Sequence, residues 1–120
     1  MDISKAIARL KGEPGFKEKV GMVLVHNGVV RGTARADGAR VKALEVEPDR
    51  ARMQAICREI EARPGIFRAV AEANSGRLYP GDDVLFLIVA GDLRENVKPA
   101  LSDLLDRIKA EAVAKREFYE

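Results

Sequence analysis

An uninterrupted apolar run at positions 84–90 (VLFLIVA) restricts the fold of this chain more than any other feature of the sequence. The run is far shorter than the roughly 20 residues that a helix needs to cross a bilayer. It is rich in residues that favour strands, and a turn-forming Pro-Gly-Asp cluster at 80–82 precedes it. We therefore predict a strand here, in the same sheet as a second strand-like segment at 66–73, and no membrane span.

Three other segments carry apolar residues at helical spacing. The positions are Ile3, Ala6, Ile7 and Leu10; then Met53, Ile56, Cys57 and Ile60; then Val97, Leu101, Leu104, Leu105, Ile108 and Ala112. Each stripe predicts an amphipathic helix with its apolar face toward a sheet. The third helix, of about 16 residues, is expected to end the fold, with Pro99 accommodated in its first turn. Cys57 is predicted to be a small buried residue of the core.

Two more strands are expected upstream of the second helix. The β-rich run 20–25 leads through a turn at 26–28 into Val29-Val30-Arg31, which places Arg31 at a strand end. Segment 41–46 follows an Asp-Gly turn and alternates apolar with polar residues, as a half-exposed strand does. This order of elements predicts an α+β fold, with a mixed, mainly antiparallel sheet packed against two to three helices.

Size and composition favour one domain and narrow the kinds of site that it can hold. A chain of 120 residues, 47% of them hydrophobic, supports one core, so residues 1–120 are predicted to form a single domain. The net charge of +2 comes from nearly balanced charges and does not imply a nucleic-acid partner. One cysteine and one histidine allow no internal disulfide or structural zinc site. No signal-peptide pattern opens the sequence, so we expect a cytoplasmic protein. We also expect no bound metal or cofactor.

Four motifs occur in a specific order along the chain. They are Gly-Val-Val-Arg at 28–31; Leu-Glu-Val-Glu at 44–47, followed by Met53; Gly-Arg-Leu-Tyr-Pro-Gly-Asp at 76–82; and Leu-Asp-Arg-Ile-Lys at 105–109, followed by Lys-Arg-Glu at 115–117. Taken together, from about Ile7 to Glu117, they resemble the catalytic (large) subunit family of molybdopterin synthase. The resemblance implies an α/β hammerhead fold.

The same resemblance implies a role in molybdenum cofactor biosynthesis. The family converts cyclic pyranopterin monophosphate into molybdopterin by two sulfur transfers. A small ubiquitin-like subunit carries the sulfur as a thiocarboxylate on its C-terminal Gly-Gly tail, which enters a pocket on the large subunit. The implied assembly is a heterotetramer, a homodimer of large subunits with a small subunit at each end.

The site residues that the resemblance implies are basic. Lys109 matches the reactive lysine and Lys115 the second lysine, while Arg31 and Arg94 match substrate-binding arginines. Arginine suits phosphate and carboxylate groups, and a lysine whose pKa is lowered can move protons or act as a nucleophile. His26 matches no catalytic position of the family and is expected to be structural or exposed.

The segment between the two lysines departs from the family pattern. Its Pro-aromatic stretch is replaced by Ala-Glu-Ala-Val-Ala at 110–114, which is one residue shorter. If these helix-forming residues continue the helix, Lys115 is rotated by about 240° from Lys109 and advanced by roughly 9 Å. Arg116 then returns to the face of Lys109, which makes it a further substrate-binding candidate. The family match nevertheless favours Lys115.

Two histidine-arginine pairs of the family are also changed. Leu93 stands where a histidine precedes Arg94, and Ala73 and Asn74 replace the second pair. Three functions therefore stay open. They are a sulfur-transferring large subunit, a non-catalytic homologue that acts as a partner-binding or regulatory module, and a pocket for some other phosphorylated small molecule.

Overall fold

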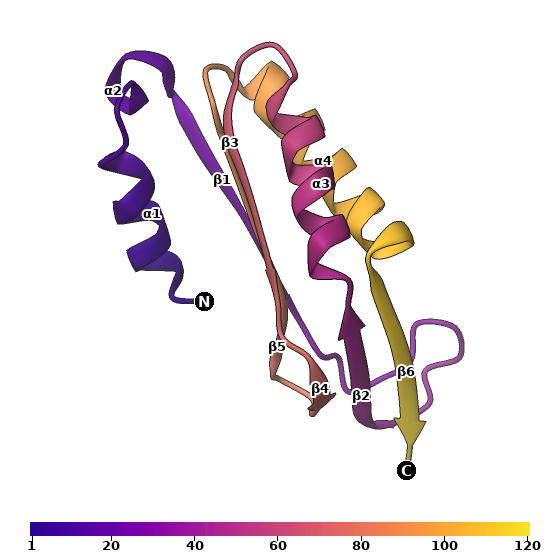
Figure 1. The fold of residues 1–120 in the computed structure, drawn as a ribbon. Helices are drawn as coiled ribbons and strands as arrows, with labels where there is room; N and C mark the ends of the chain where they lie inside the picture. Colours follow the sequence, from indigo (N-terminus) through magenta and orange to yellow (C-terminus); the bar gives the residue numbers. More distant parts are fainter.

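The computed structural model describes residues 1–120 as two three-stranded sheets and four helices in an elongated molecule of 51 × 25 × 24 Å (Figure 1). The elements are α1 (Ile3–Lys11), α2 (Phe16–Lys19), β1 (Met22–Val29), β2 (Val41–Pro48), α3 (Arg50–Glu61), β3 (Ile66–Ala73), β4 (Gly76–Leu78), β5 (Asp83–Gly91), α4 (Arg94–Glu111) and β6 (Val113–Tyr119). One sheet has the order β1-β5-β3 and the other β4-β2-β6. All strand pairs are antiparallel.

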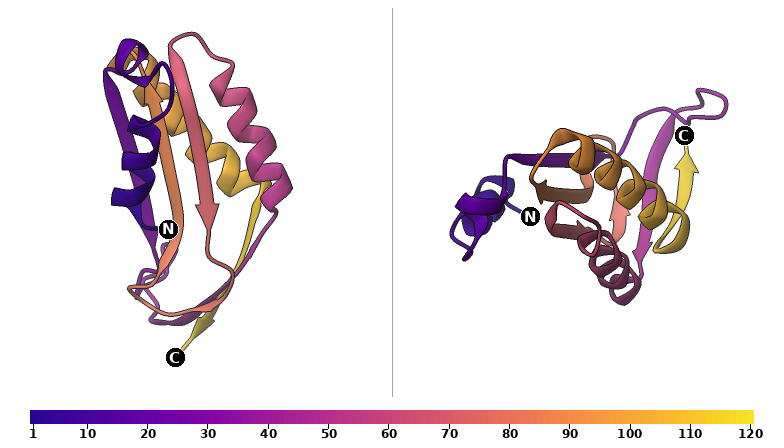
Figure 2. Two further views of the ribbon diagram at one scale, coloured as in Figure 1. Left: turned by 60° about the vertical axis from the view of Figure 1, so that its left-hand side comes forward. Right: turned by 90° about the horizontal axis from the view of Figure 1, so that it is seen from above.

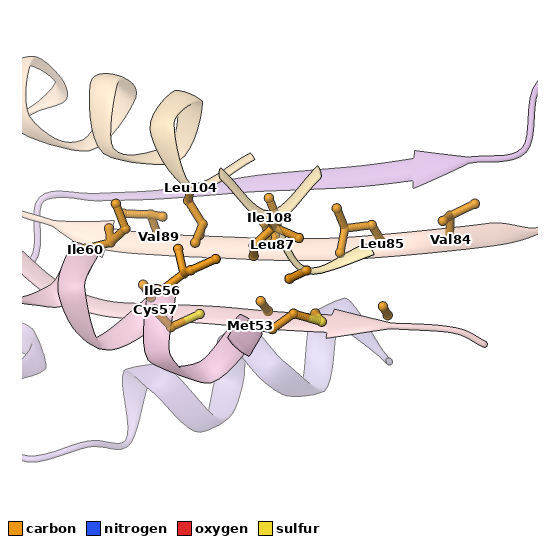
Figure 3. Packing of buried hydrophobic residues seen from close by; sticks show 14 of the residues in the cluster. Met53, Ile56, Cys57, Ile60, Val84, Leu85, Leu87, Val89, Leu104 and Ile108 are labelled. Atoms are coloured by element: carbon orange, nitrogen blue, oxygen red, sulfur yellow. The ribbon is translucent and has the colours of Figure 1, made fainter. Parts of the chain in front are cut away.

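The predicted apolar strand is β5, the central strand of the sheet β1-β5-β3. It pairs with β1 on one side and with β3 on the other, so the expected pairing of segments 66–73 and 84–90 is confirmed. Helices α3 and α4 cover one face of this sheet, and α1 and α2 lie on the other side (Figure 2). Leu85, Leu87 and Val89 belong to the core beneath α3 and α4 (Figure 3). Burial on both faces explains why this strand has no polar alternation.

The three predicted helices are present, with changes at their ends. In α3, Asp49 is the N-cap, and its Oδ1 accepts a hydrogen bond of 2.9 Å from the Arg52 amide. Cys57 is fully buried, as predicted. The prediction that Pro99 lies in a first turn is wrong, because α4 already begins at Arg94. No helix in the structure combines the length and apolar character required to traverse a bilayer.

The prediction of one mixed sheet is corrected to two wholly antiparallel sheets, and the prediction that a helix ends the fold is also wrong. Helix α4 stops at Glu111, and the backbone carbonyl of Ala112 accepts a hydrogen bond of 2.7 Å from the Asp49 amide. From Val113 onward the chain pairs with β2 as strand β6. These ladder hydrogen bonds outweigh the local preference of segment 110–114 for helix.

The first strand is longer than predicted. β1 runs through the expected turn at 26–28 and ends at Val29, with an irregularity in its pairing between Gly28 and Val29. Arg31 follows two residues later, so its predicted place near a strand end is confirmed. The expected Asp-Gly turn is present, with Gly38 at a φ of 73°. Arg31 thus lies in the loop that follows β1.

Candidate functional site

A cleft of about 760 Å³ lies between the end of β1, the C-terminal end of α4 and the inner face of β6. The polar residues that line it are His26, Arg31, Thr33, Arg35, Lys109, Lys115, Glu117 and Tyr119. Three of the five predicted site residues, Arg31, Lys109 and Lys115, thus meet in one cleft. They come from three separate parts of the fold.

The backbone beside Arg31 is fixed by its buried neighbour Val30. The Val30 amide donates to the Asp82 carbonyl at 2.8 Å, and its carbonyl accepts from the Gly81 amide at 2.9 Å. Arg31 itself donates from Nε to the Thr33 carbonyl at 3.0 Å. This is the only protein hydrogen bond of its side chain, so its terminal guanidinium nitrogens are free to bind a ligand.

Lys109 and Lys115 approach the cleft from different elements. Lys109 lies in the last turn of α4, whereas Lys115 lies on β6 opposite Val46, a buried core residue of β2. Residues opposite each other in neighbouring strands point to the same face, so Lys115 faces inward. Partial burial lowers the pKa of Lys115, the positive charge of Lys109 lowers it further, and Glu117 opposes both effects. The charge of Lys109 therefore acts on Lys115 across the cleft.

Positive charge dominates the cleft. Arg31, Arg35, Lys109 and Lys115 take part in none of the salt bridges of the molecule, and Glu117 is the only carboxylate in the lining. Unpaired cations that converge on a concave surface attract and bind anions. The arrangement can bind a phosphate or carboxylate group, and a lysine with a lowered pKa can exchange protons with it.

His26, which was expected to be structural or exposed, also lines this cleft. It stands on β1 opposite Leu87, which places it on the sheet face that α4 covers. Its Nε2 atom is buried and has no hydrogen-bond partner. Burial lowers the pKa of His26, and the charges of Lys109 and Lys115 lower it further. The imidazole is consequently neutral at pH 7.

Comparison with known proteins shows the family to which this chain belongs. The family described as MoaE protein matches residues 1–111 of the sequence. The chain belongs to the MoaE protein family. The matched part of this MoaE chain includes Arg31 and Lys109, and it ends before β6 and Lys115. The resemblance to the molybdopterin synthase large subunit is thereby confirmed.

Individual relatives agree with the family assignment. The MoaE chain is 28% identical over 109 residues to a probable molybdopterin synthase from Haloferax volcanii. That match covers 88% of this chain but only 41% of the Haloferax protein, so the chain spans less than half of that relative. The structure of molybdopterin cofactor biosynthesis protein E from Burkholderia multivorans superposes with a TM-score of 0.77 at 25% identity, covering 100% of this chain and 82% of that one.

A third comparison concerns the fold alone. A complex of subunits 1 and 2 of the molybdopterin-converting factor from Helicobacter pylori contains a chain that matches with a TM-score of 0.71 at 14% identity. The match covers 100% of this MoaE chain and 80% of the Helicobacter chain. The predicted α+β class, with mainly antiparallel strands and few helices, is confirmed by these structural matches.

Two predicted site residues lie outside the cleft of this MoaE chain. Arg94 begins α4, and its Nε forms an ion pair of 3.1 Å with Glu95 at the surface. It is 15 residues before Lys109, about 22 Å along the helix. Arg116 follows Lys115 in β6 and points to the opposite face, where its guanidinium stacks 5.0 Å from the Phe118 ring centroid. The proposed pairing of Lys109 with Arg116 on a continuous helix is therefore wrong.

The two replaced histidine-arginine pairs have different surroundings. Leu93 is the N-cap residue of α4 and is 58% exposed. Asn74 has a structural role, because its Nδ2 donates to the Asp83 carbonyl at 2.9 Å and its amide donates to the Val84 carbonyl at the same distance. Neither residue lines the cleft.

Sequence reasoning missed five polar lining residues: His26, Thr33, Arg35, Glu117 and Tyr119. Alternation along β1 offered a signal for His26, because Leu24 and Gly28 lie on the same face at a spacing of two. The expected turn at 26–28 hid that signal. Glu117 could be placed only after β6 was known to be a strand.

Proposed function

We propose that this chain is the large subunit of a cytoplasmic molybdopterin synthase, which converts cyclic pyranopterin monophosphate into molybdopterin with sulfur from a thiocarboxylated small subunit. The observation that carries the proposal is the meeting of Lys109 and Lys115 with Arg31 in one cleft of a MoaE-family chain. Lys109 lies on α4 and Lys115 on β6. On a continuous helix the two side chains would point in different directions.

Each basic group has a distinct role in this proposal. The free guanidinium nitrogens of Arg31, with Arg35 beside them in the lining, bind the phosphate of the substrate. Lys109 is the reactive lysine by the family resemblance. Lys115, whose pKa is lowered, supplies a neutral amine more often than an ordinary lysine and can therefore accept a proton during sulfur transfer.

The proposed partner is a small ubiquitin-like subunit with a C-terminal Gly-Gly thiocarboxylate. The positive lining suits the anionic tail, and the Gly-Gly end is what the family resemblance implies. The Helicobacter structure, a complex of subunits 1 and 2, supports such a partner. A homodimer of large subunits belongs to the proposal as well. Within it, the exposed Arg94 is available to the cleft of a second copy.

Reconstitution tests this function directly. The purified chain is mixed with a thiocarboxylated small subunit and cyclic pyranopterin monophosphate, and molybdopterin formation is followed over time. We expect product, and a rate at least about 100-fold lower for Lys109→Ala, the usual effect of removing a proton-transfer group. Lys98→Ala is the matched control, because Lys98 is an exposed lysine on the same helix outside the cleft. Absence of product with the matching small subunit contradicts the proposal.

A non-catalytic partner-binding homologue is the second candidate, and the exposed Leu93 at the position of the family histidine favours it. In that case the small subunit binds with normal affinity in calorimetry, no molybdopterin forms, and Lys109→Ala has no effect on growth that requires the cofactor. A growth defect specific to Lys109→Ala, with Lys98→Ala normal, excludes this candidate.

A further inference from the structure

We propose that His26 contacts the ligand of the cleft and takes up a proton when a phosphate-bearing ligand binds. The inference rests on the proposed function only in taking a phosphate ester as the ligand. It begins with the position of the ring. Residue 26 lies on the face of β1 that α4 covers, and its partner across the sheet, Leu87, is completely buried.

The second observation is the state of the Nε2 atom. It is buried without a hydrogen-bond partner, although buried polar atoms in proteins nearly always have one. A β-carbon at position 28 would lie 3.0 Å from Nε2, closer than ordinary van der Waals contact, so glycine at that position leaves the ring room to turn. Nε2 has almost no surface open to solvent in the empty cleft, so in this proposal the ring turns toward the ligand, which then satisfies the atom that the protein leaves without a partner.

The third observation is the set of groups that face the cleft. Helix α4 contributes Lys109; strand β6 contributes Lys115, Glu117 and Tyr119; the segment after β1 contributes Arg31 and Arg35; and β5 contributes only the apolar Val84 and Leu85. Four cations and one carboxylate make a proton on the imidazole unfavourable while the cleft is empty. The lowered pKa of His26 agrees with this balance of charge.

A bound dianion reverses the balance. Negative charge beside the lysines offsets their repulsion of a protonated ring, and the new Nε2–H donates a hydrogen bond to an anion oxygen. The proton comes from solvent, and only this N–H bond forms. By linkage, a complex that binds an additional proton becomes tighter as the pH falls through the interval between the pKa values of His26 in the free and bound states.

NMR of the single histidine tests the coupling in the unmodified chain. The ring proton resonances of His26 are followed against pH in sodium sulfate and in sodium chloride of equal ionic strength, since sulfate is a dianion that does not titrate in this range. We expect sulfate to raise the titration midpoint of His26. A midpoint that saturating sulfate leaves unchanged, or a cleft that does not bind sulfate, overturns the proposal.

Calorimetry provides the second measurement. Sulfate binding is measured, in two buffers with different ionisation enthalpies, at a pH between the free and bound midpoints. We expect proton uptake by the wild type and by Lys98→Ala, and its loss in His26→Gln, which still binds sulfate. Undiminished uptake in His26→Gln overturns the proposal. Neither measurement involves turnover, so a chain that makes molybdopterin without this proton uptake refutes the role of His26 alone.

Discussion

Lys115 on β6 lies close enough to Lys109 on α4 for the charge of one to depress the pKa of the other. The change from helix to strand between them makes this possible. Helix α4 ends at Glu111, and Val113 is already paired with Pro48 of β2. Two lysines that a continuous helix would hold about 240° apart are thereby turned toward one cleft.

The first prediction concerns this electrostatic coupling. Lys109→Ala removes a positive charge near Lys115, so the pKa of Lys115 should rise toward that of an ordinary lysine. The pKa can be followed through the ε-carbon resonance of a chain labelled at lysine. Lys98→Ala is the control and should leave the Lys115 titration unchanged. An unaltered Lys115 titration in Lys109→Ala would show that the two groups are not coupled.

The second prediction concerns stability below neutral pH. The pKa of His26 in the folded chain is below its ordinary value of 6.5, so the unfolded chain binds more protons in the interval between the two. Stability must therefore decrease as the pH falls from about 6.5 through the folded pKa. His26→Gln should flatten this part of the profile, measured as the free energy of unfolding in urea. Parallel profiles for wild type and variant would contradict the lowered pKa.

The third prediction concerns the ionic contact between α3 and α4. Glu111 accepts hydrogen bonds from Arg107 and Arg52, which lower its pKa from 4.5 to about 2. A depressed carboxyl pKa stabilises the fold above 4.5, and this contribution is lost as the pH falls toward 2. Glu111→Gln should reduce stability at neutral pH and remove this acid-dependent loss. Thermal unfolding at several pH values checks both effects, and a variant as stable as wild type at pH 7 would refute the prediction.

The fourth prediction concerns the only cysteine. Cys57 lies on the buried face of α3, and burial raises the pKa of its thiol to about 11. A thiol reagent should modify it only after denaturant is added, because the thiolate is the reactive species. Cys57→Ser should lower the free energy of unfolding by about 1–3 kcal/mol, the cost of burying an unpaired hydroxyl. Rapid modification of the native protein would mean that the α3 side of the core opens readily.

The fifth prediction separates two neighbouring cations of β6. Lys115 faces the cleft, whereas Arg116 stacks on Phe118 on the opposite face. Lys115→Ala should weaken sulfate binding about tenfold, as expected for one charge-assisted hydrogen bond. Arg116→Ala should leave the affinity within error of wild type, because Arg116 faces away from the cleft. The two substitutions change the net charge equally, so their comparison separates a local contact from overall charge. Equal losses for both variants in calorimetry would indicate that sulfate responds only to overall charge.

Much of the fold could be predicted because its signals are local. The apolar run of β5 and the stripes of α1 and α3 follow directly from residue spacing. Strand β6 could not be predicted in that way. Its first residues favour a helix, and only hydrogen bonds with β2, more than sixty residues earlier in the chain, make it a strand.

The site residues also differ in whether local sequence signals could predict them. Arg31 was predictable, because its motif, its strand end and the turn after it are all contiguous in the sequence. Lys115 was predicted from the family resemblance, while local propensity alone pointed to Arg116. His26 and Glu117 were missed, since a side chain's place in the cleft depends on which sheet face its strand presents to α4. Arg94 matched a motif, but the length of α4 carries it away from the lysines.

The pairing of β6 with β2 determines which residues of β6 face the cleft. Because side chains alternate in a strand, the number of residues between the helix end and the second lysine matters chiefly as odd or even. Removing one residue between Glu111 and Lys115 would turn that ammonium group outward, and removing two would turn it inward again but would shift it along the strand. Sequence drift in this segment is therefore constrained less by the chemistry of Ala112 to Ala114 than by their count.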